Sequence, residues 1–273
     1  MDIITQFEDR LRLKNVSLKT AYVYVRIAKS LLQQNCDFFS QEQEKIISFM
    51  SKRVKDGMSS SYLIQHLAVI SFIRKTIIGI IDKIEIPKPI REITIPDVLT
   101  KDEFQKIYTL TENMKHKCIL ALMYSAGMRC GEVVGLKIKD VDGANNKIVI
   151  RKSKGKVDRV VLLDESVLIL LRKYWAEYKT NEYLFEGQKG GQYSTRSIQE
   201  IVKQACKKAK IRKKISSHSL RHSCFTQLVK DGVDLRLVQR LAGHKNINTT
   251  AGYIRVTDED VLNIKSPIKS MSI

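Results

Sequence analysis

Apolar residues recur every three or four positions in the first third of the chain, which is the spacing of one buried face of an α-helix. Ser17 and one of the serines at 59–61 precede two of these stretches, and serine is a favoured N-cap because its hydroxyl accepts a hydrogen bond from the first turn. Three helices are predicted, and their apolar faces include Ile3, Phe7, Leu11, Ala28, Leu32, Leu63, Leu67, Ile70 and Ile77.

Three of the four prolines, Pro87, Pro89 and Pro96, lie in one short segment without apolar periodicity. Proline-rich, extended chain of this kind is typical of a linker between domains. We therefore expect an all-helical domain over residues 1–86, a linker over 87–97 and a second domain over 98–273.

The second domain is predicted to be mainly helical with a small antiparallel sheet. Thr100 and Glu103 form a capping-box pattern at a helix start, and Gly127 suits the end of a helix running from Lys117 to Ser125. The segment KIVIRKSKGKVDRVVLLD predicts two short strands around a turn at 153–156. Further helices are expected at 164–177, at 195–209, from Ser216 or Ser217 to Gly232, and from Asp234 to Gly243.

Lysine and arginine total 48 against 29 acidic residues, which gives a net charge of +19. This balance favours a polyanionic partner, with nucleic acid ahead of an anionic membrane surface, although charge alone leaves open a merely basic protein. The chain has no apolar run long enough to span a bilayer, and MDIITQFEDR does not resemble a secretory signal peptide. We expect a cytoplasmic protein associated with the nucleoid.

The cysteines are odd in number, widely spaced and without a C-x-x-C pair, which argues against a disulfide framework and a cysteine-based zinc site. His218 and His222 stand four residues apart, as two zinc ligands of a metalloprotease helix would. Ser219 occupies the position where such a motif needs glutamate. We therefore expect neither a metal nor a cofactor.

His218 and Arg221 stand three residues apart, so a helix brings both side chains to one face. A guanidinium beside an imidazole suits an anion that undergoes proton transfer, and a phosphodiester is the obvious candidate. A second histidine, His244, follows within LAGH, and Tyr253 comes nine residues later.

Together HSLRH, LAGH and the tyrosine resemble the C-terminal signature of tyrosine site-specific recombinases, the phage-integrase and Xer group. YSAGMRCGEVVGL resembles the family segment with the first catalytic arginine, and RKSKGKVDRVVLL the hairpin with a lysine before glycine. The resemblance covers about residues 96–255. More weakly, residues 1–86 resemble the family's helical, SAM-like core-binding domain for DNA.

The resemblance implies a metal- and ATP-independent DNA strand transferase with Tyr253 as the nucleophile that forms a 3′-phosphotyrosine. Lys154, before Gly155, would protonate the leaving 5′ oxygen, and His218 would handle the tyrosine proton. Glu132 is either a buttress for the first arginine or an exposed acid at a helix N-terminus. The implied catalytic residues are Arg129, Lys154, His218, Arg221, His244 and Tyr253.

Further lysines suit contacts with the DNA backbone, although those beside Lys154 also fit a solvated hairpin tip. The sequence departs from the family pattern at Ser217, at Ala242 and at Gly252, which precedes the nucleophile and leaves open how it is positioned. The backbone-contact candidates are Lys152, Lys156, Lys207, Lys208, Lys213 and Lys214.

Two other functions remain open at this point. Two capped helices joined at DGVD resemble a helix-turn-helix in a non-enzymatic DNA-binding protein, and a type IB topoisomerase shares the phosphotyrosine chemistry. The order of the motifs favours an enzyme over a plain DNA-binding protein, and the helical N-terminal domain with the close spacing from LAGH to the tyrosine favours a recombinase over a topoisomerase. The family resemblance implies that it acts on double-stranded DNA as four protomers on two sites. An accessory or partner recombinase, the DNA target and the docking of the C-terminal tail on a neighbouring protomer stay undetermined.

Overall fold

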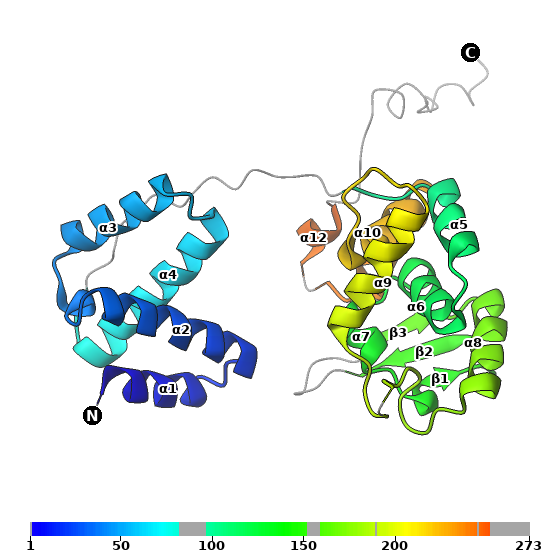
Figure 1. Cartoon of the computed structure of the whole chain (residues 1–273), viewed down its shortest axis with the longest axis horizontal. Helices are drawn as coiled ribbons and strands as arrows, with labels where there is room; N and C mark the ends of the chain where they lie inside the picture. Colours follow the sequence, from blue (N-terminus) through cyan, green and yellow to red (C-terminus); the bar gives the residue numbers. More distant parts are fainter. Residues whose placement is uncertain (1, 82–96, 152–158, 189, 245, 252–273) are drawn as a thin grey trace, which may run out of the picture. The chain divides into compact units, whose positions relative to one another are not determined.

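Helices dominate both of the compact units into which the chain divides, Met1–Thr94 and Ile95–Ile273. The computed structural model describes residues 2–81, 97–151, 159–188, 190–244 and 246–251 (Figure 1). The predicted linker over 87–97 lies outside the described residues except for Asp97.

The first unit packs its helices around aromatic and branched side chains that are almost fully buried, among them Phe7, Ile27, Leu31, Phe38 and Ile70. Ser17 and Ser59 are confirmed as N-caps, since each hydroxyl accepts from the backbone N–H group three residues on. The elements are α1 (Ile3–Leu13), α2 (Leu18–Gln34), η1 (Phe38–Ser40), α3 (Gln43–Lys55), α4 (Ser60–Ile73) and η2 (Arg74–Ile78).

Two features of the first unit differ from the sequence pattern. Helix α3 was not predicted, because its mostly polar sequence buries only Ile46 and Met50. Ile77 does not continue α4 but lies in the π-helical turn η2, which ends at Gly79 in the left-handed region at φ 84°. Arg74 begins this turn and donates from its buried guanidinium to the carbonyls of Phe39 and Gln41, at 2.8 and 2.7 Å.

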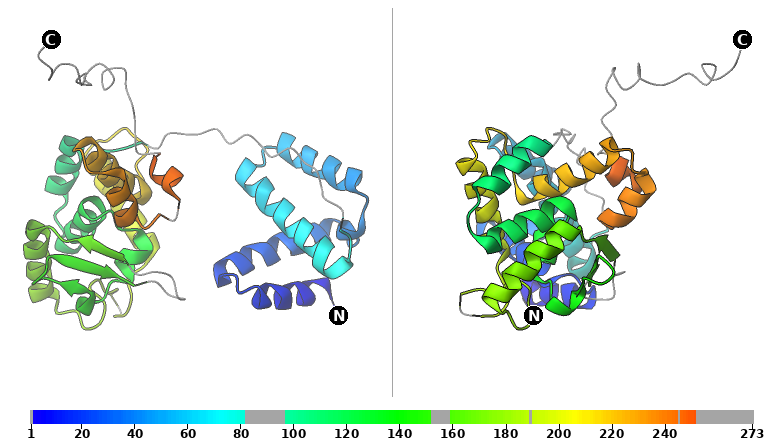
Figure 2. Two further views of the ribbon diagram at one scale, coloured as in Figure 1. Left: turned by 180° about the vertical axis from the view of Figure 1, so that it is seen from behind. Right: turned by 90° about the vertical axis from the view of Figure 1, so that its right-hand side faces the viewer.

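In the second unit, helices surround a three-stranded antiparallel sheet with the order β1-β2-β3 (Figure 1). Helix α6 packs against both α8 and α10, and β3 packs against α11 (Figure 2). Its first elements are α5 (Lys101–Leu110), α6 (Met114–Ser125), α7 (Cys130–Val134), η3 (Ile138–Asp140), β1 (Val141–Asp142), β2 (Lys147–Ile150) and β3 (Arg159–Leu162). The helices that follow are α8 (Glu165–Tyr178), α9 (Thr195–Lys208), α10 (Ser217–Lys230), α11 (Leu235–Ala242) and α12 (Ile247–Ala251).

The fold class is confirmed: the chain is mainly helical with a small antiparallel sheet. The capping box of Thr100 and Glu103 is also confirmed, and Ser216 rather than Ser217 caps α10. The predicted start of α6 at Lys117 was wrong, because the Asn113 side chain accepts from the N–H of His116 and begins the helix at Met114. The two-residue strand β1 was too short for the sequence pattern to reveal.

Within the described residues, no helix has the length and apolar character needed to cross a membrane. The same residues contain no group of three or more His, Cys, Asp or Glu side chains that could hold a metal ion.

Candidate active site

Arg129 is placed by a tight turn that leads into α7. Gly127 adopts φ +57°, where a side chain is disfavoured, and a Cβ there would lie only 2.5 Å from the ring of Phe225. The chain then extends through Arg129, which is the N-cap residue of α7. The Arg129 side chain is 34% exposed, so part of its guanidinium is open to a ligand.

Glu132, one turn into α7, holds Arg129 from two sides. Its Oε2 accepts from the Arg129 backbone N–H and its Oε1 accepts from Arg129 Nη1, both at 2.8 Å. The Glu132 side chain is only 12% exposed. In this structure it therefore lies inside the cluster, where it orients Arg129, and not on the open surface of the helix N-terminus.

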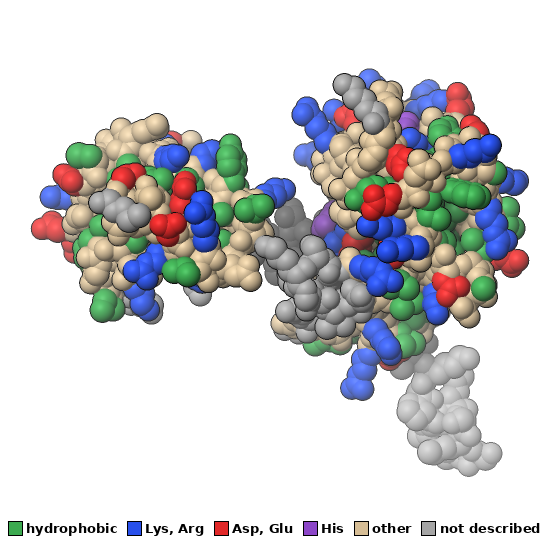
Figure 3. Space-filling model, turned by 90° about the horizontal axis from the view of Figure 1, so that it is seen from below, with side chains coloured by type: hydrophobic (Ala, Val, Ile, Leu, Met, Phe, Trp, Pro, Cys, Tyr) green, Lys and Arg blue, Asp and Glu red, His purple; other side chains and the backbone are tan. Residues whose placement is uncertain are grey.

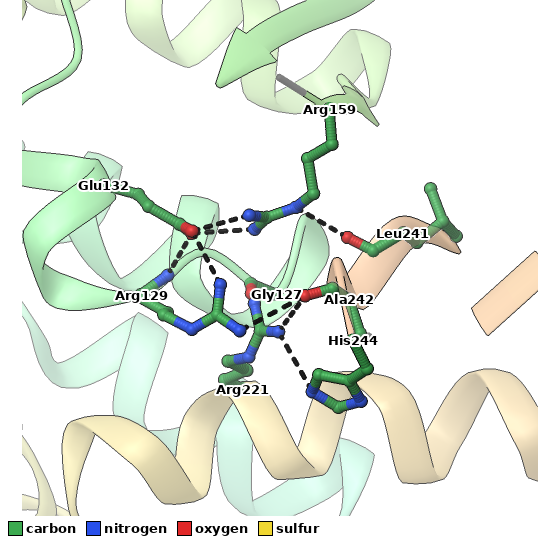
Figure 4. Close-up of polar contacts among 8 residues, drawn as sticks. All are labelled: Gly127, Arg129, Glu132, Arg159, Arg221, Leu241, Ala242 and His244. Carbon is green, nitrogen blue, oxygen red and sulfur yellow. Dashed lines mark hydrogen bonds and ion pairs between the residues drawn. The ribbon is translucent and has the colours of Figure 1, made fainter. Parts of the chain in front are cut away.

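Arg221 enters the same cluster from α10 and is almost fully buried. Its Nη1 donates to the carbonyl of Gly127 and its Nη2 to the carbonyl of Ala242 (Figure 4). Arg129 Nη2 donates to the same Ala242 oxygen at 3.4 Å. One backbone carbonyl thus brings the two guanidinium groups together.

His244 follows directly after Gly243, whose left-handed conformation at φ 62° ends α11. Its Nε2 lies 3.5 Å from Arg221 Nη2, and its Nδ1 lies 3.0 Å from the hydroxyl oxygen of Thr250. Because a guanidinium only donates, Nε2 acts as the acceptor, and Nδ1 is left to donate to Thr250. Gln239 fixes the segment by donating to the His244 carbonyl at 3.1 Å.

His218 lies at the start of α10, on the same helix as Arg221, and remains exposed. Its ring approaches that of His222 edge-on, with 5.9 Å between the ring centroids. The structure thus brings Arg129, His218, Arg221 and His244 into one neighbourhood of three helices, α7, α10 and α11.

This neighbourhood is electrostatically positive, and its positive charge helps to lower the pKa values of the histidines. Desolvation and the positive charges of Arg221 and Arg129 lower the pKa of His244 to about 4. The same causes lower the pKa of His218. Desolvation, His218 and Arg221 lower the pKa of His222. At neutral pH these imidazoles are uncharged, and the arginines favour an anion beside them.

Glu132 shows the opposite effect. Burial raises its pKa, but the hydrogen bonds from the Arg159 side chain and the Arg129 backbone, with both positive charges, lower the pKa to about 2. The carboxylate therefore stays ionised and hydrogen-bonded, and it leaves the cluster with an excess of positive charge.

Arg159 is the residue that sequence reasoning missed. It begins β3 and donates to both carboxylate oxygens of Glu132 and to the carbonyl of Leu241 (Figure 4). In β3, Arg159 and Val161 are buried whereas Val160 and Leu162 are exposed. A buried arginine needs partners for its charge and its donors, but the sequence RVVL does not show that Arg159 lies on the buried face, so no local signal could have found it.

Several predicted site residues lie outside the described residues. These are Lys154 and its neighbours Lys152 and Lys156, and the tyrosine Tyr253.

The other candidate lysines belong to the end of α9 and to the segment before α10. Lys208 Nζ pairs with Glu112 at 2.5 Å, and Lys213 Nζ pairs with Glu103 at 2.6 Å and with the Val98 carbonyl at 3.1 Å. On the face of the second unit shown in Figure 3, Lys and Arg side chains are spread over the surface rather than confined to one patch. The two remaining candidates, both exposed, are Lys207 and Lys214.

The arrangement is suited to holding a phosphodiester. Two guanidinium groups can neutralise the non-bridging oxygens, and a neutral imidazole can accept or relay a proton at physiological pH. The donor set in the described residues, nitrogen atoms of arginine and histidine with a single ion-paired carboxylate, favours an anion over a metal ion.

Known proteins resemble the chain over most of its length. The family model described as the phage integrase family matches residues 97–260. The tyrosine recombinase XerA of Pyrococcus horikoshii is 30% identical over 262 residues, which are 94% of this chain and 90% of that protein. The integrase/recombinase y4qK of Sinorhizobium fredii is 36% identical over 188 residues. This match spans 67% of this chain and 60% of that protein.

Solved structures share the fold. The Tn1549 transposon integrase, in complex with a circular intermediate DNA, has a TM-score of 0.79 at 18% identity, covering 96% of this chain and 98% of that one. The XerH site-specific recombinase, bound to its difH substrate, has a TM-score of 0.73 at 23% identity, covering 95% of this chain and 83% of that one.

Proposed function

Because the chain belongs to the phage integrase family of tyrosine recombinases, we propose that it cuts and rejoins duplex DNA at specific sites through a 3′-phosphotyrosine intermediate. The observation that carries the proposal is the convergence of Arg129 and Arg221 on the carbonyl of Ala242, with His244 two residues further along. Three groups of the kind that bind phosphate oxygens therefore meet at one point.

In the proposed reaction, Tyr253 attacks the scissile phosphorus. A bond forms between the phenolic oxygen and phosphorus, and the bond from phosphorus to the 5′ oxygen breaks. His218 takes the proton of the phenol, and its lowered pKa supports this role because the neutral imidazole is the form that accepts. Lys154 supplies the proton that the leaving 5′ oxygen needs.

Arg129, Arg221 and His244 hold the non-bridging oxygens while negative charge accumulates on them. The phosphotyrosine keeps the energy of the phosphodiester, so attack by a 5′-hydroxyl rejoins the strand without ATP or a metal ion. Rejoining to the 5′-hydroxyl of a second duplex, instead of the original one, gives recombination.

The proposed partner is double-stranded DNA, which the protein would meet at the nucleoid in the cytoplasm. Helical residues 1–86 and the unit from residue 98 would both bind the duplex, and four protomers would act on two sites. Structures related by fold support the DNA partner, because the Tn1549 integrase and XerH were both solved bound to DNA.

The test is covalent capture of DNA. Genomic fragments that the protein retains at low salt are converted to nicked duplexes, which trap the intermediate because the short cleaved strand diffuses away. The reactions contain EDTA and no ATP, and denaturing gels resolve protein linked to DNA. We expect a band with wild type and with Tyr178→Phe, a half-exposed tyrosine of α8, and none with Tyr253→Phe.

A band that persists in Tyr253→Phe would contradict the proposed nucleophile. Relaxation of supercoiled plasmid without exchange between sites would indicate a topoisomerase. Salt-sensitive DNA binding with no covalent band on any retained fragment would indicate a non-enzymatic DNA-binding protein.

A further inference from the structure

Arg159 is buried at the start of β3, and its side chain is only 6% exposed. A guanidinium that loses its water needs its donors satisfied, and here three separate nitrogens have partners. Nη1 and Nη2 donate to Glu132 Oε1 and Oε2 at 2.5 and 2.7 Å, and Nε donates to the Leu241 carbonyl at 2.8 Å.

The fork on Glu132 has a direct consequence for Arg129. Each carboxylate oxygen accepts once from Arg159 and once from Arg129, so the four hydrogen bonds fix the plane of the carboxylate. Charge-assisted, bidentate pairs of this kind are strong and geometrically specific. The position of the Arg129 guanidinium therefore depends on a side chain that comes from a different element.

The third contact ties the same guanidinium to the segment that carries His244. The Leu241 carbonyl lies in the last turn of α11, whose left-handed end at Gly243 leads into His244. A Cβ at Gly243 would lie 3.0 Å from Arg159 Cδ, so the chain passes closely over the arginine side chain. Arg159 is thus in contact with the supports of both Arg129 and His244.

Arg159 differs from Arg129 in what it can do. Arg129 is 34% exposed and can turn a donor toward a ligand, whereas the donors of Arg159 point at a carboxylate and a carbonyl within the protein (Figure 4). Direct contact between Arg159 and a DNA phosphate would require breaking its bidentate ion pair with Glu132, whereas Arg221 donates to the neutral carbonyls of Gly127 and Ala242. Its effect on a reaction must pass through other residues.

We propose that Arg159 is a positioning residue that sets the distance between Arg129 and His244, and so shapes the site for the scissile phosphate. The inference rests on the proposed function. Its physical basis is that a shift of about 1 Å in a catalytic group can cost about 100-fold in rate. Arg159 bonds both to Glu132, which holds Arg129, and to the Leu241 carbonyl in the last turn of α11, just before His244.

The experiment measures single-turnover cleavage of a nicked duplex whose scissile linkage is either a phosphate or a methylphosphonate. A methylphosphonate lacks the negative charge that the arginines neutralise. Its cleavage should therefore depend less on how well Arg129 is positioned. We expect Arg159→Met to cleave the phosphate about 10- to 100-fold more slowly than wild type and to recover most of this loss on the methylphosphonate. Affinity for uncleaved DNA should change less than threefold, because contacts with phosphates elsewhere on the duplex provide most of the binding.

A double variant tests the route of the effect. If Arg159 acts largely through Arg129, then Arg159→Met should slow cleavage much less in the Arg129→Ala background than in the wild type. Should Arg159→Met not fold, Arg159→Lys gives the same test, because it keeps the positive charge and loses the planar fork.

Arg74→Met is the matched control, because Arg74 is an equally buried arginine that donates to two backbone carbonyls in the first unit. It should lower stability without changing the ratio of the two cleavage rates. Equal slowing of Arg159→Met on both linkages, or a wild-type rate, would overturn the inference. A wild type that captures neither substrate would overturn the proposed function and the inference with it, a result distinct from slow cleavage by the variant alone.

Discussion

The guanidinium of Arg221 donates a hydrogen bond to the carbonyl oxygen of Gly127, two residues before Arg129. The second arginine of the cluster is therefore attached to the turn that positions the first. Phe225, one turn further along α10, packs under the Arg221 guanidinium at 4.7 Å and also fills the space beside Gly127. Helix α10 thus contributes both a cation and the shape of this turn.

Gly127→Ala should destabilise the second unit. The new Cβ would meet the Phe225 ring at 2.5 Å, and the φ of +57° adds strain. Strain of about 1 kcal/mol and overpacking of about 1–3 kcal/mol together predict a loss of about 2 kcal/mol or more in the free energy of unfolding. Urea denaturation measures it. Gly131→Ala is the control, because no atom lies within 4 Å of its Cβ position, and it should be neutral or slightly stabilising.

Arg129→Ala and Arg221→Ala should each slow covalent capture at least ~100-fold, because each removes a donor to the charge of the transition state. Their effects on folding should differ. Arg221 is almost fully buried and bonds to two carbonyls, so its loss should also lower the melting temperature. Arg129 is one-third exposed, and Glu132 keeps Arg159 as a partner without it, so its loss should lower stability less than the loss of Arg221. The prediction fails if Arg129→Ala cleaves as fast as wild type at saturating DNA.

Glu132 should contribute to stability in a way that depends on pH. Its pKa of about 2 in the folded chain lies below the ordinary 4.5, so its contribution is complete above pH 4.5 and is lost as the pH falls toward 2. The shift corresponds to about 3 kcal/mol at neutral pH. Free energies of unfolding for wild type and Glu132→Gln should therefore differ most at pH 7 and converge at low pH. A difference independent of pH would show that the lost stability does not arise from ionisation.

Affinity for DNA should rise as the pH falls from about 8 toward 5.5. A phosphate beside His244 offsets the positive charges that lower its pKa, so the complex holds more protons than the free protein. Binding of a labelled duplex at constant ionic strength measures the slope. His244→Gln should flatten it, whereas His116→Gln, which removes a histidine of α6 with a pKa also lowered by burial, should leave it unchanged. A slope unaltered in His244→Gln would contradict the proposed phosphate contact.

The four described lysine candidates should not contribute equally to DNA binding. Each phosphate contact adds about 0.9 to the slope of log affinity against log salt. Lys208 and Lys213 are already paired with Glu112 and Glu103, and a phosphate must compete for them. Lys207→Gln and Lys214→Gln should therefore reduce the slope more than the corresponding changes at Lys208 and Lys213. Equal slopes in all four variants would show that the ion pairs have no influence.

Local chemistry made much of the fold predictable from the sequence. Thr100 and Glu103 cap α5 through bonds that span three residues, and Ser17 does the same for α2. Because both partners of such a bond lie within one helical turn, the sequence alone is enough to predict it. The pattern missed α3, because this helix buries only Ile46 and Met50. It placed the start of α6 three residues late, because an unrecognised cap, Asn113, begins that helix.

By itself the sequence determined where most helices begin and end, and which motifs carry cationic and imidazole side chains. Only the tertiary structure decided how these groups are held, since the bonds that hold them join residues far apart in the chain. Arg159 meets Leu241 across 82 residues, and Arg221 meets Gly127 across 94. Whether a buried guanidinium finds a carboxylate or a carbonyl depends on how α7, α10, α11 and β3 pack, and no local pattern encodes that packing.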